Sequence, residues 1–511
     1  MKPPGRSPRV FHPFLFALFP VLFLFYFNAQ QVSMRAFWQS IAAVLAATCL
    51  LWGLLSLLVH DRRRSAAVTS LLLVLFFSYG HAMNVLQGTT LWFFQVQGHK
   101  NLLALWAAIF LLGILRLSRL KNLDRLTMLL NSISLLLSAW AAVAGCTEYL
   151  KVRSGHVEIS DLDPAESRGI SSSPDIYYII LDGYGRADVL QRYYGYDNAP
   201  FVEWLRGKGF YVATEAKANY LLTLFSLSSA FGMGYLDTIA AQLGPASKNT
   251  LPFQRLIRDG PVIHYLKKRG YLTAAFSSGI FWTELRNADV YLEPLLVPSN
   301  FQNELLSTTL VRAIVRAFDF QSEYHRKRIR YALHQLPRTT RLRSPTFVFA
   351  HILCPHPPFV FDRAGRARRL RRNFLFWDAK SLEGETRENY RDQLIFLTGQ
   401  VQTALEGILN NTRSPAVIIL QSDHGPGFFS SPNNSPDYLR ERVPILSAYY
   451  FPDRDYSHLY PGISPANTFR VIFNQYLGTQ LPLLENRTYQ AGPKGWYDFH
   501  EVILPEERSH D

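Results

Sequence analysis

Five long apolar runs in the first 150 residues constrain the fold more than any other feature of the chain. Each run approaches the ~20 residues that a helix needs to cross a hydrocarbon layer of ~30 Å. The first run is not a cleavable signal, because no small-residue cleavage site follows it and four more runs do. We therefore expect five membrane-spanning helices, over residues 10–28, 37–59, 66–86, 101–117 and 126–146.

Basic residues between these runs predict their orientation. Lys2, Arg6 and Arg9 precede the first run, and basic clusters at 62–64 and 116–125 occupy two alternate loops, whereas the other two loops carry a single basic residue each. Positive loops stay on the cytoplasmic side, so the N-terminus is expected inside and everything after about residue 150 outside. No charge lies deep in a run, so an ion relay is not expected. The helices either anchor the chain or also present a lipid-linked substrate.

The remaining chain has the mixed composition of an exported domain. We expect a transmembrane domain over 1–150, a polar linker over 151–174 and a catalytic domain over 175–511. In the last part strand-like runs alternate with helix-like segments, which is typical of an α/β domain with a mostly parallel sheet and helices on both faces. It contains one cysteine, so a disulfide framework is excluded there. The expected strands cover 175–182, 210–213, 271–277, 346–353, 416–422 and 445–451.

Two of these strands end in an acidic residue followed by glycine. The run PDIYYIILDGYGR ends its strand at Asp182, and AVIILQSDHGPG ends its strand at Asp423 and His424. Ligands of open α/β sheets bind at the carboxyl ends of strands, and Asp and neutral His are ordinary ligands of Zn²⁺ or Mn²⁺. An Asp at such a place can also simply cap the next helix. The adjacent Asp and His of the second strand favour a metal site.

A third strand, within 346–361, carries His351 and His356 at its end. A histidine here can donate to an anionic oxygen or shuttle a proton, although a lone histidine is more often structural. The basic stretch 363–372 follows, and it is either a solvated loop or a landing surface for anionic lipid headgroups. Nucleic acid is not expected as a partner, because this part of the chain is expected outside the cell.

Four elements in this order resemble the alkaline phosphatase superfamily: an Asp after the first strand, a Thr near a helix start, a His-x-Pro-Phe-like turn and a Ser-Asp-His-Gly strand end. The chain is most similar to the membrane branch, the lipoteichoic acid synthases and lipid A phosphoethanolamine transferases, which have five membrane helices and an exported catalytic domain. The resemblance implies that Asp182, Asp423 and His424 are metal ligands. It also implies that Thr223, in a Thr-x-x-Ser pattern, is the nucleophile and a further ligand, with Ser226 as second choice.

The same resemblance implies one divalent ion, Mn or Zn with Mg or Ca as alternatives, and substrate-binding roles for His356 and His351. The implied activity moves a phosphoglycerol or phosphoethanolamine headgroup from a phospholipid to an envelope glycan or glycolipid, through a phospho-threonine. The protein would lie in a bacterial-type inner or cell membrane, with its catalytic domain on the periplasmic or extracellular side.

Departures from the family pattern keep other functions open. The transferases carry a further histidine after Asp-His-Gly, and residues 428–442 contain none; they also carry disulfides, which this exported domain cannot form. Both differences weigh against a lipid A role. One alternative is a phosphoester or sulfate-ester hydrolase, although the C/S-x-P-x-R pattern of sulfatases is missing. The other is a catalytically inactive, lipid-binding envelope sensor or scaffold.

Overall fold

The computed structural model of the 511-residue chain divides into two compact units. The first comprises residues 1–156 and 298–320, and the second comprises 157–297 and 321–511. The sequence placed 298–320 in the exported domain, whereas this segment belongs with the apolar helices of the first unit. Most of the expected linker lies outside the described residues. The structure describes residues 8–29, 32–86, 90–91, 94–95, 99–154, 173–313, 319–368, 370, 384–430 and 435–504.

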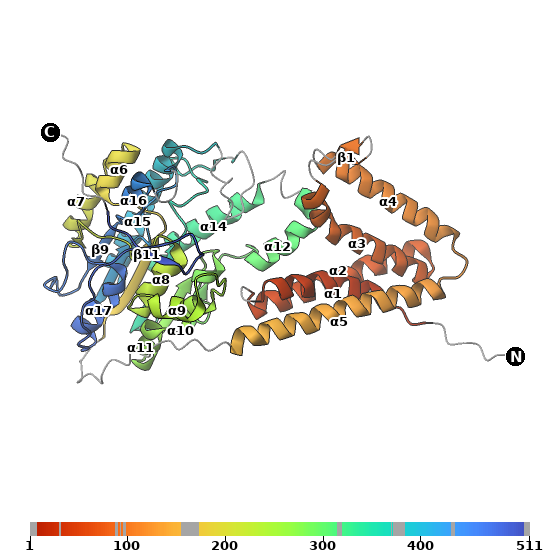
Figure 1. The fold of residues 1–511 in the computed structure, drawn as a ribbon, viewed down its shortest axis with the longest axis horizontal. Coiled ribbons are helices and arrows are strands. Elements are labelled where there is room, and N and C mark those ends of the chain that lie inside the picture. Colours follow the sequence, from red (N-terminus) through yellow and green to blue (C-terminus); the bar gives the residue numbers. More distant parts are fainter. Residues whose placement is uncertain are drawn as a thin grey trace. The chain divides into compact units, whose positions relative to one another are not determined.

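Five apolar helices form most of the first unit, one for each expected run (Figure 1). Four of them are long and apolar enough to cross a membrane, and α1 is shorter, with 16 residues and an internal Pro20. Large apolar side chains such as Leu57 and Leu136 remain exposed on this unit, as expected where helices face lipid. The helices are α1 (His12–Phe27), α2 (Met34–Val59), α3 (Arg62–Leu86), α4 (His99–Arg119) and α5 (Asp124–Ser154), and the hairpin β1 (Thr90–Leu91) and β2 (Phe94–Gln95) precedes α4.

A short helix from much later in the chain, α12 (Asn300–Thr308), completes the first unit. Ser299 and Gln302 form a capping box at its start, so its first backbone N–H groups have partners. Phe301 and Leu305 are four residues apart and therefore lie on one face of the helix. Both pack into the same apolar cluster as Phe77 of α3. This helix is thus amphipathic, and its apolar face packs on the apolar helices of the first unit.

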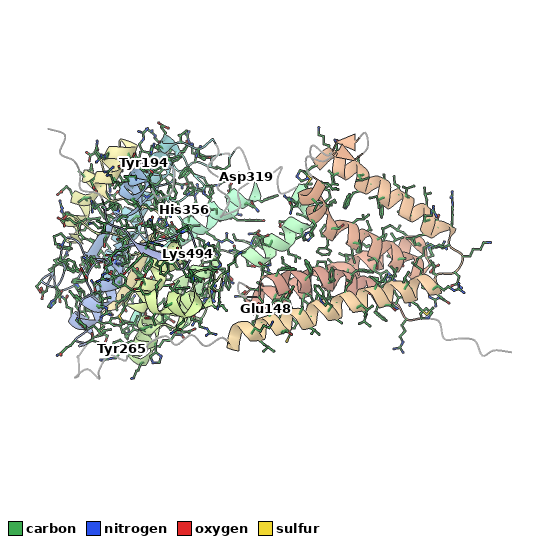
Figure 2. All side chains as sticks on the ribbon, viewed as in Figure 1. Glu148, Tyr194, Tyr265, Asp319, His356 and Lys494 are labelled. Atoms are coloured by element: carbon green, nitrogen blue, oxygen red, sulfur yellow. The ribbon has the colours of Figure 1, made fainter. Side chains whose placement is uncertain are left out.

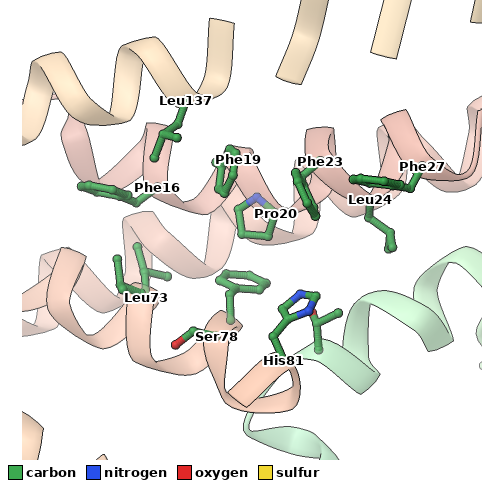
Figure 3. Close-up of a pocket in the computed structure, with 13 residues that line it drawn as sticks. Phe16, Phe19, Pro20, Phe23, Leu24, Phe27, Leu73, Ser78, His81 and Leu137 are labelled. Atoms are coloured by element: carbon green, nitrogen blue, oxygen red, sulfur yellow. The ribbon is translucent and has the colours of Figure 1, made fainter. Parts of the chain in front are cut away.

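An apolar groove of about 590 Å³ lies among these helices (Figure 3). Phe16, Phe19, Phe23 and Phe27 of α1 line it, and His81 of α3 lies at one end. Its lining is almost entirely apolar.

A seven-stranded sheet forms the centre of the second unit, in the order β4-β9-β8-β3-β7-β5-β6. The pairs that β9 makes are antiparallel and the others are parallel, which confirms the expected mostly parallel α/β fold. All six expected strands are present, and three short ones were missed: β6 (Val290–Leu292), β10 (Tyr489–Ala491) and β11 (Phe499–Glu501). The six are β3 (Asp175–Leu181), β4 (Tyr211–Val212), β5 (Leu272–Phe276), β7 (Thr346–Ile352), β8 (Ala416–Gln421) and β9 (Ser447–Tyr450).

The central strand β3 is buried on both faces, because helices cover the sheet on each side (Figure 1). Successive side chains of a strand point to opposite faces, so Tyr178 enters one core cluster and Tyr177 enters the other. Tyr265 belongs to the first cluster and Tyr194 to the second (Figure 2). The first cluster holds α8 (Thr223–Gly232), α9 (Asp237–Leu243), α10 (Leu251–Asp259), α11 (Pro261–Lys268) and α17 (Pro465–Tyr476); the second holds α6 (Ala187–Tyr194), α7 (Ala199–Gly207), α14 (Phe320–Gln335) and α15 (Arg387–Asn411).

Candidate active site

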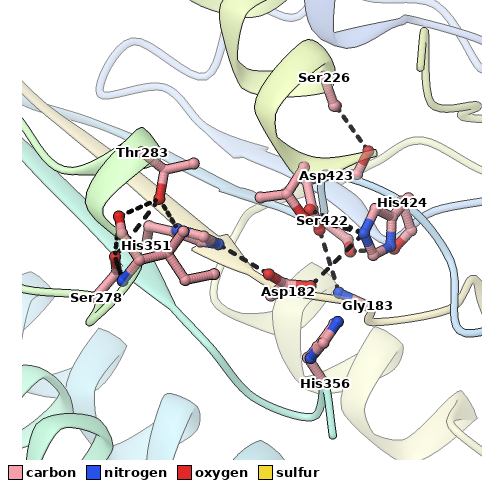
Figure 4. Close-up of polar contacts among 12 residues, drawn as sticks. Asp182, Gly183, Ser226, Ser278, Thr283, His351, His356, Ser422, Asp423 and His424 are labelled. Atoms are coloured by element: carbon pink, nitrogen blue, oxygen red, sulfur yellow. Dashed lines mark hydrogen bonds and ion pairs between the residues drawn. The ribbon is translucent and has the colours of Figure 1, made fainter. Parts of the chain in front are cut away.

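Three residues expected to bind metal, Asp182, Asp423 and His424, meet where the neighbouring parallel strands β3 and β8 end (Figure 4). One oxygen of each carboxylate and one ring nitrogen of His424 all lie within 4.8 Å of one another. None of the three residues is more than 1% exposed. Gly183 has φ +75, a conformation that suits glycine, and so turns the chain sharply after Asp182. Its N–H donates to Asp423 Oδ1 at 3.2 Å, which ties the two strand ends together.

Three oxygen atoms lie around His424 Nε2 at distances that ligand atoms of one metal ion can have. Nε2 lies 3.2 Å from Asp423 Oδ2, 3.7 Å from Asp182 Oδ1 and 3.1 Å from Thr223 Oγ1. Ligand atoms around a tetrahedral ion with bonds of 2.0–2.1 Å are about 3.3 Å apart. Asp182 Oδ1 and Asp423 Oδ2 are buried and have no hydrogen-bond donor among the described residues. Since buried anionic oxygens need a partner, the residues fit a divalent cation.

The hydrogen bonds of His424 present the correct ring nitrogen to such an ion. Nδ1 lies 3.0 Å from the carbonyl oxygen of Gly425 and therefore carries the hydrogen, which leaves the lone pair of Nε2 facing the carboxylates. Burial, assisted by the positive charge of Arg442, lowers the pKa of His424 well below its ordinary value. His424 is thus neutral, and its close contacts with the two carboxylates are not ion pairs.

The two carboxylates titrate differently because they share one buried space. Burial and the negative charge of Asp182 raise the pKa of Asp423 to about 7. Burial also raises the pKa of Asp182, but the nearby His356, His351 and His424 outweigh this effect and hold it well below its usual range. Two like charges at this distance oppose each other's ionisation. A bound cation would allow both to be ionised together.

Thr223 is the first residue of α8, where the helix presents free N–H groups and partial positive charge. Its side chain faces His424, and the residue is 8% exposed, so it is the most accessible member of the group. Ser226, one turn later, donates from Oγ to the carbonyl oxygen of Asp423 at 2.7 Å. Ser226 therefore fixes α8 against the strand end. The structure brings Thr223 to the expected ligands, and Leu222 just before it is 40% exposed.

The two histidines of the β7 end lie in different surroundings. His351 is 1% exposed, with Nε2 at 3.1 Å from Asp182 Oδ2 and Nδ1 at 2.9 Å from Thr283 Oγ1. It holds one oxygen of Asp182 and thereby leaves the other oxygen facing Asp423. His356 is partly exposed, and its ring centre is 6.3 Å from that of His424. The substrate-binding roles of both remain predictions, and the contacts of His351 favour a positioning role.

Two residues of the site were missed by sequence reasoning. Arg442, the last residue of α16 (Pro436–Arg442), places Nη2 at 2.8 Å from His424 Nε2, and Thr283 supports His351 from the segment after β5. Neither has a spacing signal, since Arg442 follows His424 by 18 residues and Thr283 precedes His351 by 68.

The described part of the basic stretch 363–372 is occupied by contacts with acidic residues of the same unit. Salt bridges of this kind at a surface contribute little to stability, but they do engage the charges. The contacts favour the solvated-loop interpretation over a landing surface for lipid headgroups. The pairs are Arg363–Asp392, Arg366–Asp362 and Arg368–Glu385.

Of the comparisons with known proteins, only the one with solved structures found proteins similar to this chain. No model of a protein family matches the chain, and no curated protein matches it. The C-terminal periplasmic domain of EptC from Escherichia coli is similar with 12% identity and a TM-score of 0.44, over 67% of this chain and 96% of that one.

Two further similar structures differ in how much of the chain they cover. The integral membrane lipooligosaccharide phosphoethanolamine transferase A (EptA) from Neisseria meningitidis has 12% identity and a TM-score of 0.40, over 91% of this chain and 95% of that one. A 2-O GAG sulfatase has 14% identity and a TM-score of 0.39, over 61% and 72%. Identities and TM-scores are low, so the chemistry below rests on the site itself. The similar structures are phosphoethanolamine transferases and sulfatases, the proteins that the sequence motifs resemble.

Proposed function

We propose that the protein is a membrane-anchored, metal-dependent transferase that moves a phospho-headgroup of the phosphoglycerol or phosphoethanolamine type from a phospholipid to an envelope glycan or glycolipid. One observation carries this proposal. Two buried carboxylate oxygens, which no donor of the described residues reaches, and a histidine ring nitrogen converge beside a threonine at a helix N-terminus. This set suits a cation and an attacking hydroxyl, and the apolar helices of the first unit suit a lipid donor.

Asp182, Asp423, His424 and Thr223 would hold one divalent ion, Zn or Mn by the mixture of oxygen and nitrogen donors. When bound, the ion would lower the pKa of the Thr223 hydroxyl and neutralise charge on a phosphoryl oxygen. The chain's own residues supply the rest. The N-terminus of α8 points N–H groups at the nucleophile and at an incoming anion, and His351 holds Asp182 in place.

The proposed reaction has two steps. Thr223 Oγ attacks phosphorus, the new Oγ–P bond forms, and the P–O bond to diacylglycerol breaks; the proton of the threonine hydroxyl ends on the diacylglycerol oxygen. A hydroxyl of the acceptor then attacks the same phosphorus, the Oγ–P bond breaks, and Thr223 regains a proton. Burial lowers the pKa of His356, so that it is neutral and can accept a proton in either step.

Intact-mass analysis of the full chain in detergent, mixed with metal and a phospholipid, tests the proposal. We expect a phosphoglycerol or phosphoethanolamine adduct on Thr223 that is absent from Thr223→Ala. Ser228→Ala is a matched control, because Ser228 is a buried hydroxyl of the same helix that donates to the carbonyl oxygens of Leu224 and Phe253. An adduct that only water resolves would indicate the hydrolase. No metal and no adduct would indicate the inactive scaffold and overturn the proposal.

A further inference from the structure

Arg442 lies against the candidate active site with its donors directed at defined atoms. The residue is 7% exposed. Its Nε donates to the carbonyl oxygen of Leu221 at 3.1 Å, and Nη1 donates to those of Pro426 at 2.6 Å and Gly425 at 3.3 Å. These three contacts join the residue two positions before the nucleophile to the turn that follows His424. The guanidinium is therefore held in place from one side.

The remaining contact of Arg442 is of a different kind. Nη2 donates to His424 Nε2 at 2.8 Å, and this nitrogen also lies 3.7 Å from Asp182 Oδ1 and 3.2 Å from Asp423 Oδ2. One lone pair can accept this hydrogen or bind a cation, but it cannot do both. Binding of an ion at Nε2 therefore breaks this one hydrogen bond. The contacts to Leu221, Gly425 and Pro426 do not involve the metal ligands' side chains and can persist.

Release of Nη2 leaves a charged donor beside the nucleophile. Thr223 Oγ1 lies 3.1 Å from His424 Nε2, and Arg442 Nη2 lies 2.8 Å from the same atom, so the nucleophile and the guanidinium share this nitrogen as a neighbour. A phosphoryl group attacked by Thr223 carries anionic oxygens at this place. Guanidinium donors form short, charge-assisted hydrogen bonds with phosphate oxygens. The Phe428 ring lies 5.3 Å from the guanidinium carbon and covers one face of it.

We propose that Arg442 is an exchangeable partner of the site: it satisfies His424 Nε2 before metal binds, and afterwards its freed Nη2–H binds an oxygen of the transferring phosphoryl group. This rests on the proposed phosphoryl transfer and assigns a further phosphoryl-binding residue to it. Metal binding and anion binding are thereby coupled through one side chain. Removing Arg442 has opposite effects on the two ligands, which loss of a purely structural residue does not produce.

The test titrates the full-length protein in detergent, first stripped of metal, with Mn²⁺ or Zn²⁺ alone and then, metal-loaded, with inorganic phosphate. For Arg442→Gln we expect metal affinity to rise several-fold, since a competing donor and a positive charge are gone. Phosphate affinity should fall by about tenfold or more, the size of a lost charge-assisted hydrogen bond. Arg442→Lys keeps the charge and should retain part of the phosphate binding.

Arg470→Gln is the matched control. Arg470 is 5% exposed and donates to the carbonyl oxygens of Met233 and Pro482, so its loss should lower stability without changing either affinity. If Arg442→Gln and Arg442→Lys both weaken metal binding, or leave phosphate affinity unchanged, the inference is wrong. If the wild-type protein binds no metal, the proposed function is wrong. If the wild-type protein forms the Thr223 adduct but Arg442→Gln binds phosphate as tightly as the wild type, only the inference on Arg442 is wrong.

Discussion

Buried carboxylates in two regions of the same unit, Glu284 after β5 and the pair Asp182–Asp423 after β3 and β8, show how a site differs from a structural contact. Glu284, after β5, accepts from Ser277 Oγ at 2.9 Å, from the Gly279 N–H at 3.0 Å and from Arg286 Nε at 2.5 Å. Burial raises its pKa, but the charges of Arg286 and Arg328 prevail and lower it. The chain itself neutralises this carboxylate.

The Asp182–Asp423 pair is equally buried but lacks this internal neutralisation. One oxygen of each residue has no donor among the described residues, and the pKa of Asp423 rises to about 7 because of burial and Asp182. Burial alone therefore does not identify a functional carboxylate. What distinguishes the pair is that the sheet brings two acids together, while no side chain among the described residues donates a hydrogen bond to Asp182 Oδ1 or Asp423 Oδ2.

The largest expected effect is on stability, from a substitution of Glu284. Glu284→Gln leaves the partly buried Arg286 without this buried carboxylate partner, and we expect the free energy of unfolding of the second unit to fall by about 3–5 kcal/mol. Thermal and denaturant unfolding of the purified protein measure this. Glu203→Gln, in an exposed pair with Arg206, is the control and should change stability by less than about 0.5 kcal/mol. If both substitutions have an equal, small effect, the buried Glu284 contributes no more to stability than an exposed ion pair, and the comparison is wrong.

A bound metal ion should stabilise the folded protein through its contacts with Asp182 and Asp423. At an ion concentration 100 times the dissociation constant, Mn²⁺ or Zn²⁺ should add about 2.7 kcal/mol to the free energy of unfolding. Asp423→Asn should abolish this response, whereas Glu284→Gln should retain it at its lower baseline. Melting curves with and without the ion decide this, and a response that survives in Asp423→Asn would place the ion elsewhere.

The positioning role of His351 predicts a smaller effect. His351→Leu removes the donor to Asp182 Oδ2, and loss of such a support typically costs 10–100-fold, or about 1.4–2.7 kcal/mol, in metal affinity. His351→Gln keeps an N–H that can reach the same oxygen and should recover part of the affinity. Calorimetric titration of both variants with Zn²⁺ provides the measurement. Equal losses would show that the imidazole acts in some other way.

The smallest expected effect is that of pH on metal affinity. An ion must displace the proton of Asp423, whose pKa is raised to about 7, so metal affinity should fall as pH decreases below about 7 and be nearly constant above it. For one released proton the slope approaches about tenfold per pH unit. Calorimetric titrations of the wild-type protein with Zn²⁺ at pH 6, 7 and 8 measure this slope. A wild-type affinity that is flat from pH 6 to 8 contradicts the assignment.

Apolar patterning predicted the architecture well, because burial determines it. Each of the five apolar runs became a helix, and each strand expected from a run such as 416–422 is present. The three strands of the second unit that were missed are only three residues long, and every residue of β6 is partly exposed. Residues 298–320 belong to the first unit, and the helical spacing of Phe301 and Leu305 gives their helix an apolar face.

The candidate site was predicted only where its residues end strands. Asp182, Asp423 and His424 mark such ends, and Thr223 was located through the family resemblance. The side chains that complete the site, Arg442 above all, come from segments whose own sequence has no apolar pattern or motif. Their contacts depend on the tertiary structure and therefore cannot be inferred from a single sequence.

The strand order of the sheet also has a consequence for when the protein can acquire its ion. The centre of the sheet joins segments at 175–181, 346–352 and 416–421, so β3 cannot gain either neighbour until a long stretch of chain has followed it. Pairings so distant in sequence form slowly and late. Under the proposed export, translocation precedes folding, and the ligands assemble outside the cytoplasm. We therefore expect the metal supply of the envelope, rather than that of the cytoplasm, to decide which ion the protein carries.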